Sequence, residues 1–332
     1  MPRKTETSQD QEPRHDSVLM TEVLEALALE PSNTVVDATL GGAGHFAALL
    51  ASLGAGGTLV GIDADPAAVE RGREMYARDR RPERPIAHLV NDNFRNLERI
   101  LERLGIGRVN AILFDLGWSG YQIIARRGFS FQREEPLLMT YGDGGLTGQG
   151  ETAADIVNSS SEETLADIIF TYGEEHFARG IARAIVEERS RERILTTGAL
   201  VTAIRAGTPH WYHKRKIHPA TKTFQALRIA VNDELGSLQE GLTTALTVLA
   251  PGGRLAIISF NSIEDRIVKN ILRDATHDGL GMLSPKKAIV PARTEILANR
   301  RARSAKLRVF ERAVAVPDTK SIDSFTPILS YV

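Results

Sequence analysis

The stretch Asp37-Ala38-Thr39-Leu40-Gly41-Gly42-Ala43-Gly44-His45 decides the fold of this 332-residue chain. It follows the apolar residues 34–36 and precedes residues 46–53, which have a helix-like pattern. A strand, a glycine turn and a helix form the arrangement that lets backbone approach a nucleotide closely. Gly42 and Gly44 can adopt positive φ and have no Cβ to block a ligand. The sequence therefore predicts a nucleotide-binding βα unit.

An acidic residue follows the next apolar run, residues 58–62, at Asp63. It stands about 20 residues beyond the glycines, the position from which a carboxylate holds ribose hydroxyls. The motif alone does not choose the cofactor, because Gly42-x-Gly44-x-x-Ala47 also fits a loose dinucleotide fingerprint. A tight βα turn without any ligand is the third interpretation.

Composition narrows the class of protein. The formal net charge is −1, so a nucleic-acid surface has to be a local patch. The apolar fraction of 42% and the length favour a packed chain of two domains. No run approaches 18 apolar residues and the N-terminus lacks a secretory pattern, so we expect a soluble cytoplasmic protein.

Cysteine is absent, which excludes disulfides, thiolate metal sites and a cysteine nucleophile. Methylation of cytosine at C5 needs a covalent thiolate adduct, so this chemistry is excluded as well. The eight histidines form no His-x-x-x-His pair, and the sequence predicts no metal site.

Strand-like and helix-like segments alternate along much of the chain, which predicts right-handed βαβ units and a mostly parallel sheet. The alternation stops between Gly117 and His218, where loops and helical patterns predict an inserted helical domain. A single irregular domain is the alternative. A helix is expected from Val18 to Leu29, and a capping box at Ser160-x-x-Glu163. The expected strands are residues 34–37, 58–63, 87–89, 110–115 and 254–260.

Several motifs together resemble a known family. They are His15-x-x-Val18-Leu19, the glycine loop, Gly61-Ile62-Asp63-x-Asp65-Pro66, Asp115-Leu116-Gly117, residues 127–131, residues 172–178, residues 218–235 and residues 301–308. These residues resemble the RsmH (MraW) family, and the resemblance covers about residues 15 to 313. It implies an α/β, Rossmann-like class I methyltransferase that uses S-adenosylmethionine, with an inserted all-helical domain. The implied reaction is methylation of the exocyclic N4 of a cytidine in the decoding region of 16S ribosomal RNA, in the small ribosomal subunit.

The predicted boundaries follow from this resemblance and from the break in alternation. Residues 1–14 form a disordered tail, and residues 15–120 with 218–313 form a discontinuous methyltransferase domain. Residues 121–217 form the helical substrate-recognition insert, and residues 314–332 a C-terminal tail. The sequence leaves open whether the chain forms a homodimer and whether it acts on naked RNA or on an assembled subunit.

The resemblance also implies roles for individual residues. Asp63 meets the ribose of the methyl donor and Phe94 flanks its adenine, and the remaining donor contacts are Gly42, Ala43, Gly44, His45, Asp115 and Gln122. Asp115, at the carboxyl end of its strand, accepts from cytosine N4–H or from the donor's amino group.

Three further residues are catalytic candidates. Trp118 follows Asp115 as the aromatic residue follows the acid in the Asp-Pro-Pro-aromatic motif of DNA amine methyltransferases, which predicts stacking on an extruded cytosine. Packing under the insert is the alternative. Asn232 offers a second acceptor, and a solvated helix face is its alternative. Asn261 either bonds the base or caps the helix that follows.

Two basic segments are candidates for RNA contact. Lys214, Arg215 and Lys216 lie beside two aromatic residues, which suits phosphate contact with base stacking. The second segment contributes Arg301, Arg303 and Lys306.

The chain departs from the usual family pattern at Ala38, at residues 118–120, at residues 138–140 and at Asn261. The last three lie near the expected target pocket. They leave room for a non-catalytic or retargeted RNA-binding paralogue, and a NAD-dependent oxidoreductase is a more distant alternative.

Overall fold

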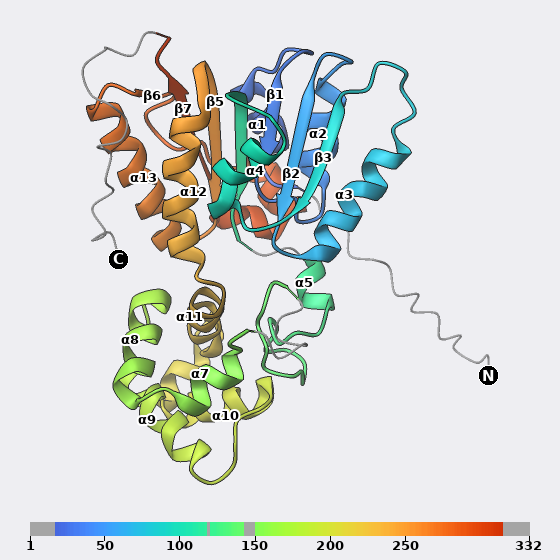
Figure 1. The fold of residues 1–332 in the computed structure, drawn as a ribbon. Helices are drawn as coiled ribbons and strands as arrows, with labels where there is room; N and C mark the ends of the chain where they lie inside the picture. The colour runs from blue at the N-terminus through green and yellow to red at the C-terminus, as the bar shows by residue number, and fades with distance from the viewer. Residues whose placement is uncertain (1–16, 118–119, 143–149, 315–332) are drawn as a thin grey trace, which may run out of the picture.

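A single twisted sheet forms the body of the molecule. The computed structural model describes residues 17–117, 120–142 and 150–314. Within these residues seven strands pair in the order β3-β2-β1-β4-β5-β7-β6, with β7 antiparallel to both neighbours and the first five strands parallel (Figure 1). The strands are β1 (Thr34–Asp37), β2 (Thr58–Asp63), β3 (Ile86–Asn91), β4 (Val109–Asp115), β5 (Leu249–Ser259), β6 (Gly281–Leu283) and β7 (Lys306–Arg312).

The strands are apolar on both faces because helices cover both sides of the sheet. Neighbouring residues point to opposite faces: Val35 packs into one hydrophobic core and Val36 into the other. Helices α1 (Met20–Leu27), α2 (Gly44–Ser52) and α3 (Pro66–Arg78) pack on one face. The other face is covered by α4 (Leu97–Arg103), α12 (Glu234–Val248) and α13 (Ser262–His277).

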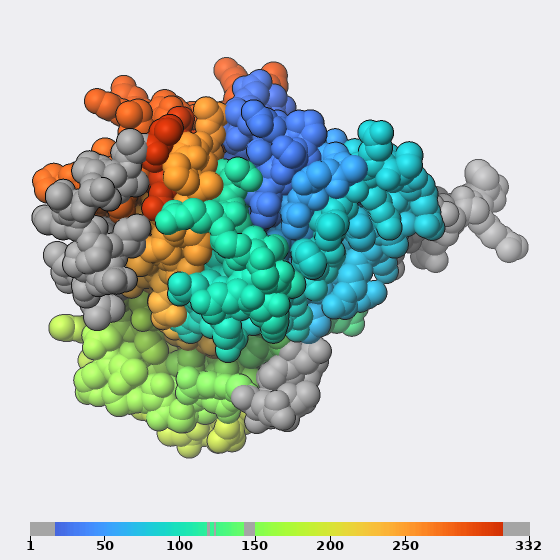
Figure 2. All heavy atoms as spheres, turned by 45° about the horizontal axis from the view of Figure 1, so that its top comes forward, coloured from blue at the N-terminus to red at the C-terminus, as the bar shows by residue number. Residues whose placement is uncertain are grey.

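A third hydrophobic core lies outside the sheet, among helices that Figure 1 shows below the carboxyl edge of the strands. They are α7 (Ala153–Ser159), α8 (Glu162–Gly173), α9 (Ala178–Arg189), α10 (Thr197–Ala206) and α11 (Ala220–Asn232). In the space-filling view this yellow-green region lies against the sheet region as one body (Figure 2). Ala220, Phe224 and Leu227 of α11 belong to this core, so α11 packs with the helices although the predicted boundary assigned it to the sheet domain. The predicted domain boundaries otherwise stay a prediction.

The connecting elements are short. They are α5 (Gly120–Ile124), α14 (Arg293–Ala298), η1 (Phe94–Asn96), η2 (His210–Lys214) and η3 (Arg300–Ser304).

All five expected strands are confirmed, with ends that differ by a few residues. The last two strands were not expected. β7 coincides with part of the basic segment that suggested an RNA-binding tail, because Lys306 and Arg308 alternate with the buried residues Leu307 and Val309. The expected helix near the N-terminus is α1. The capping box at Ser160 is wrong by one residue, since Ser161 caps α8 through the Thr164 amide.

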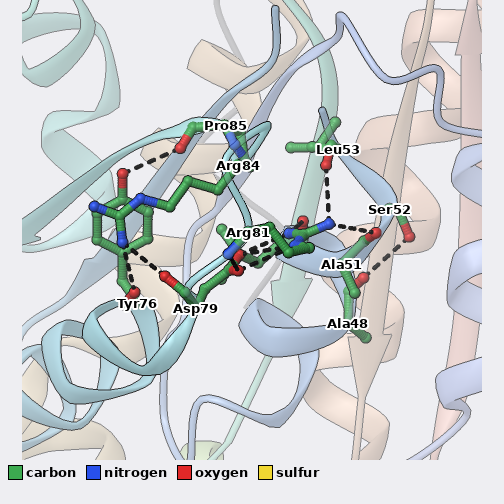
Figure 3. A network of polar contacts seen from close by, with 10 residues as sticks. Ala48, Ala51, Ser52, Leu53, Tyr76, Asp79, Arg81, Arg84 and Pro85 are labelled. Carbon is green, nitrogen blue, oxygen red and sulfur yellow. Dashed lines mark hydrogen bonds and ion pairs between the residues drawn. The ribbon is translucent and has the colours of Figure 1, made fainter. Parts of the chain in front are cut away.

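The loop that leads into β3 is fixed by a polar network (Figure 3). The Arg81 guanidinium donates to the carbonyl oxygens of Leu50, at 2.8 Å, and of Ala51 and Leu53, and it pairs with Asp79. It therefore satisfies the free carbonyls at the end of α2. This contact ties the end of α2, which begins at the glycine loop, to the loop between α3 and β3.

Among the described residues, no helix is both long enough and apolar enough to cross a bilayer.

Candidate active site

A cavity of about 370 Å³ opens at the carboxyl ends of β1, β2 and β4. Ligand pockets in parallel α/β sheets lie at this edge, and the volume is within the usual range for small molecules. The walls come from the glycine loop, the ends of β2 and β4, η1, the junction of α11 with α12, the start of α13 and η3. One site thus collects residues that are up to 287 positions apart in the sequence, from Ser17 to Ser304.

The glycine loop forms one wall, but its backbone differs from the expectation. Positive φ occurs at Gly41 (49°) and Ala43 (61°), and not at Gly42 or Gly44. Gly44 lies close to Ser17 instead, and a Cβ there would overlap the Ser17 hydroxyl oxygen unless that side chain rotated away. Gly42 and Gly44 therefore do not use the positive φ that glycine permits, while the absence of their side chains still lets a ligand approach the loop backbone.

Asp63 lies at the end of β2 and holds the glycine loop. Its Oδ2 accepts from the Gly41 amide at 2.8 Å, and its Oδ1 accepts from the Asp65 amide at 2.8 Å. Burial raises the pKa of Asp63 to about 6, and these two hydrogen bonds oppose the shift. Asp63 lines the cavity, so its place at the edge of the site agrees with the predicted contact to a ribose, which remains a prediction.

Asp115 lies at the end of β4 and contacts the side chain of His45, with 3.2 Å between Oδ2 and Nδ1. Its backbone amide donates to Thr39 Oγ1 at 2.7 Å. The other carboxylate oxygen, Oδ1, is buried and has no hydrogen-bond partner among the described residues. Because Asp115 lines the cavity, Oδ1 is an acceptor that a ligand amine can use.

Phe94 forms part of the opposite wall. Its ring packs edge to face on Phe114, with 5.3 Å between centroids, and it lies against Gly241 of α12. A Cβ on Gly241 would come within 2.7 Å of the Phe94 ring. Gln122, from α5, is buried and lines the same cavity. Both side chains line the cavity, and their contact with the methyl donor stays a prediction.

Asn232 has partners that the sequence did not indicate. Its Oδ1 accepts from the Tyr141 amide at 2.9 Å, and its Nδ2 donates to the carbonyl oxygens of Met139 and Arg228. Asn232 therefore holds the loop around residues 139–141 at the cavity, and the solvated helix face is wrong as an interpretation.

Asn261 caps α13, because its Oδ1 accepts from the amides of Ile263 and Glu264. Of its two interpretations, helix capping is the one the structure shows, and Asn261 also lines the cavity. A direct bond to the base stays a prediction for both asparagines.

A buried charged cluster in the cavity wall was missed by the sequence analysis. Arg228 pairs with Glu234 at 2.8 Å and lies 4.0 Å from Glu264, and the Tyr141 hydroxyl donates to Glu234 at 2.6 Å. Burial would lower the pKa of Arg228, but the surrounding negative charges raise it, so the guanidinium is charged. Burial raises the pKa of Glu264 against the effect of Arg228. The available signal was a pair of opposite charges six residues apart in the sequence, Arg228 and Glu234.

The candidate RNA contacts lie in different places. Arg301 and Arg303 line the cavity from η3. Lys306 instead pairs with Asp265 at 2.7 Å, so a structural partner uses its charge. Lys214, Arg215 and Lys216 are exposed on the helical region, before the start of α11, and none of them lines the cavity. Trp118 lies outside the described residues.

The sheet order, the glycine loop at its carboxyl edge and the acidic residues at the ends of β2 and β4 define a class I methyltransferase, which uses S-adenosylmethionine as methyl donor. The family model described as "MraW methylase family" matches residues 12–313. The chain belongs to this family.

Curated relatives agree over nearly the whole chain, and each is named "Ribosomal RNA small subunit methyltransferase H". The relative from Deinococcus radiodurans is 47% identical, over 91% of this chain and 90% of its own length. The relative from Syntrophotalea carbinolica is 44% identical, over 90% of this chain and 98% of its own length. The relative from Brevibacillus brevis is 41% identical, with the same two coverages. These matches exclude the NAD-dependent oxidoreductase, the more distant alternative.

Proposed function

We propose that this protein methylates the exocyclic N4 of a cytidine in the decoding region of the small-subunit ribosomal RNA. The observation that carries the proposal is the buried Oδ1 of Asp115, an acceptor without a partner among the described residues in the wall of the cavity. The relatives named as ribosomal RNA small subunit methyltransferases support the choice of RNA. The absence of cysteine supports attack by a nitrogen rather than by a ring carbon.

S-adenosylmethionine, when bound, supplies an electrophilic methyl group on a sulfonium. The glycine loop, Asp63, Phe94 and Gln122 would hold it, since they line the cavity between the ends of β1, β2 and β4. Gly42 has no side chain and lines the cavity, so the loop backbone can approach such a ligand closely there. The residues that line the cavity are polar near Asp63 and aromatic at Phe94, which suits a ribose and an adenine.

The acceptor amine is a weak nucleophile, because its lone pair is delocalised into the pyrimidine ring. A hydrogen bond from N4–H to Asp115 Oδ1 favours the pyramidal amine and frees the lone pair. The carboxylate then takes the proton that N4 loses. Holding the amine about 3 Å from its target supplies much of the remaining reduction of the barrier.

A direct test incubates the protein with small ribosomal subunits and labelled methyl donor, followed by nucleoside analysis. We expect label in N4-methylcytidine, and we expect Asp115→Asn to lower kcat by at least about 100-fold, the range for a positioned proton acceptor. Binding of RNA without any labelled nucleoside would instead show the non-catalytic paralogue. Label in another nucleoside would refute the assignment of the target.

Trp118 stays part of the proposal as the residue that stacks on the extruded cytosine. Trp118→Ala is expected to weaken turnover of RNA more than the affinity for the methyl donor, because stacking acts only on the base. Equal losses in both measurements would contradict stacking and support packing of the indole in the protein.

The basic residues of the helical region are proposed to bind RNA phosphates. Lys214, Arg215 and Lys216 are exposed beside Trp211, which is 58% exposed. Replacing the three by Gln should reduce the salt dependence of RNA affinity, by a slope of about 0.7 for each lost contact to single-stranded RNA. Lys286→Gln with Lys287→Gln, also exposed, is the matched control. An unchanged slope in the triple variant would remove this surface from the proposal.

A further inference from the structure

The side chain of His45 is buried between two hydrogen-bond acceptors. Its Nε2 lies 3.1 Å from the carbonyl oxygen of Val18, and its Nδ1 lies 3.2 Å from Oδ2 of Asp115. A carbonyl oxygen and an ionised carboxylate can only accept, so each ring nitrogen has to donate. Both nitrogens can donate only when the ring is an imidazolium.

The charges around the ring agree with this protonation state. Asp115 faces it from β4 and Asp37 from β1, and among the described residues before α1 the Val18 carbonyl, which is neutral, contacts the ring. Burial by itself would lower the pKa of His45, but the hydrogen bond and the charge of Asp115, together with Asp37, raise it above 6.5. The cationic ring therefore has its compensating charge within contact distance.

His45 and Thr39 between them fix Asp115. The ring donates to Oδ2, and Thr39 Oγ1 accepts from the Asp115 backbone amide. The remaining oxygen, Oδ1, is buried and has no partner among the described residues, and it belongs to a side chain that lines the cavity. An unclamped carboxylate would rotate about its last torsion and exchange its two oxygens, since that torsion is broad and roughly two-fold.

We propose that His45 is a positioning residue whose imidazolium clamps Asp115 through Oδ2, so that Oδ1 faces the exocyclic amine of the acceptor base. The inference rests on the proposed function for the identity of that amine. It assigns to the His45 side chain a role different from the predicted contact with the methyl donor, which the backbone of the glycine loop can make without the ring. The second ring nitrogen ties the chain before α1 to the same clamp through Val18.

Two substitutions separate the two bonds of the ring. In His45→Asn the amide nitrogen takes the place of Nδ1, so the bond to Asp115 persists while the bond to Val18 is lost. In His45→Gln the amide nitrogen takes the place of Nε2, so the bond to Val18 persists while Asp115 is released. His277→Gln, at a side chain 89% exposed, is the control for loss of a histidine.

We expect His45→Gln to lower kcat by about 100-fold, within the range for loss of a positioned catalytic group, and His45→Asn by less than about tenfold. The affinity for the methyl donor, measured by calorimetry, should change less than about threefold in both, a factor below 1 kcal/mol. Equal loss of kcat in the two variants, with a parallel loss of donor affinity, would overturn the clamp.

Nitrogen chemical shifts of the His45 ring give a measurement that does not depend on activity or on folding of a variant. Two protonated ring nitrogens at pH 7 are expected in the wild-type protein, and a neutral tautomer would overturn the proposal. Wild-type protein that leaves N4 of cytidine unmethylated would refute the proposed function instead, whatever the state of the ring.

Discussion

The buried ion pair between Arg127 and Asp65 offers the sharpest test of how the segment after β4 is attached to the sheet. The Arg127 side chain is 7% exposed and the Asp65 side chain 5%, with 2.9 Å between Nη2 and Oδ2. Arg127 Nη1 also donates to the carbonyl oxygen of Tyr141 at 2.6 Å. Asp65 in addition caps α3 through the Ala67 amide. Removing Arg127 therefore leaves a buried carboxylate whose charge is uncompensated.

The perturbation is Arg127→Met, which keeps much of the volume of the side chain and removes its charge. Breaking a buried pair by removing one partner costs about 3–5 kcal/mol. Asp65→Asn removes the opposite charge but keeps a good N-cap, because Asn and Asp cap helices about equally well. In the double variant no buried charge is left unpaired, so we expect it to recover more than half of the loss.

The assay is urea unfolding of the four proteins of the cycle, followed by circular dichroism, with the free energy of unfolding extrapolated at a common slope. The coupling free energy between the two sites should reach at least about 2 kcal/mol, within the range for residues in one network. A loss below about 1 kcal/mol in Arg127→Met would show a pair of the solvent-exposed kind. A double variant no more stable than Arg127→Met would show that lost packing, and not the stranded charge of Asp65, causes the effect.

Two further outcomes are expected. Gly241→Ala should weaken methyl-donor binding measured by calorimetry, because its Cβ would displace the Phe94 ring by about 0.7 Å. The control is Gly236→Ala in the same helix, whose Cβ would meet the movable carboxylate of Asp233, and this variant should bind the donor normally. Equal affinities in the two variants would contradict the role of Phe94. Asp37 has a pKa raised to about 7 by burial, so its protonated form stabilises the fold fully below about pH 4, and this contribution is lost as pH rises through 7. Asp37→Asn should therefore remove up to about 1.4 kcal/mol per pH unit from the slope of unfolding free energy between pH 4 and 7, and an unchanged slope would show that other groups cause it.

Much of the sheet could be predicted because each parallel strand carries a local signal. The apolar runs that end in Asp37, Asp63 and Asp115 form strands that are buried on both faces of the sheet. A continuous apolar run of four to seven residues between turns is typical of such a buried strand. β7 was missed because Lys306 and Arg308 made a strand look like a charged tail. Their charges are matched by Asp265 of α13, which is 41 positions from Lys306 and carries no local indication of the contact.

The candidate site also contains residues that the sequence predicted and contacts that it did not. Gly42, Gly44, His45, Asp63 and Asp115 were found from motif and position, and the structure places them at one cavity, whereas the predicted contact Ala43 is buried and does not line it. The buried pair of Arg228 with Glu234, and the link from Asn232 to the loop at Tyr141, were not found. Each of these contacts forms only when the helical region is packed against the sheet, so no local sequence pattern predicts it.

The amino-acid sequence alone determined the strand–turn–helix unit, the acidic strand ends, the family and the chemistry excluded by a chain without cysteine. These are properties of neighbouring residues, and hydrophobic periodicity or backbone sterics report them directly. Only the tertiary structure decided that His45 donates to both Val18 and Asp115, that Asp65 receives the charge of Arg127, and that Lys306 is occupied by Asp265. A buried charge requires a partner, but which partner it meets is set by packing between distant segments, and no local pattern encodes that choice.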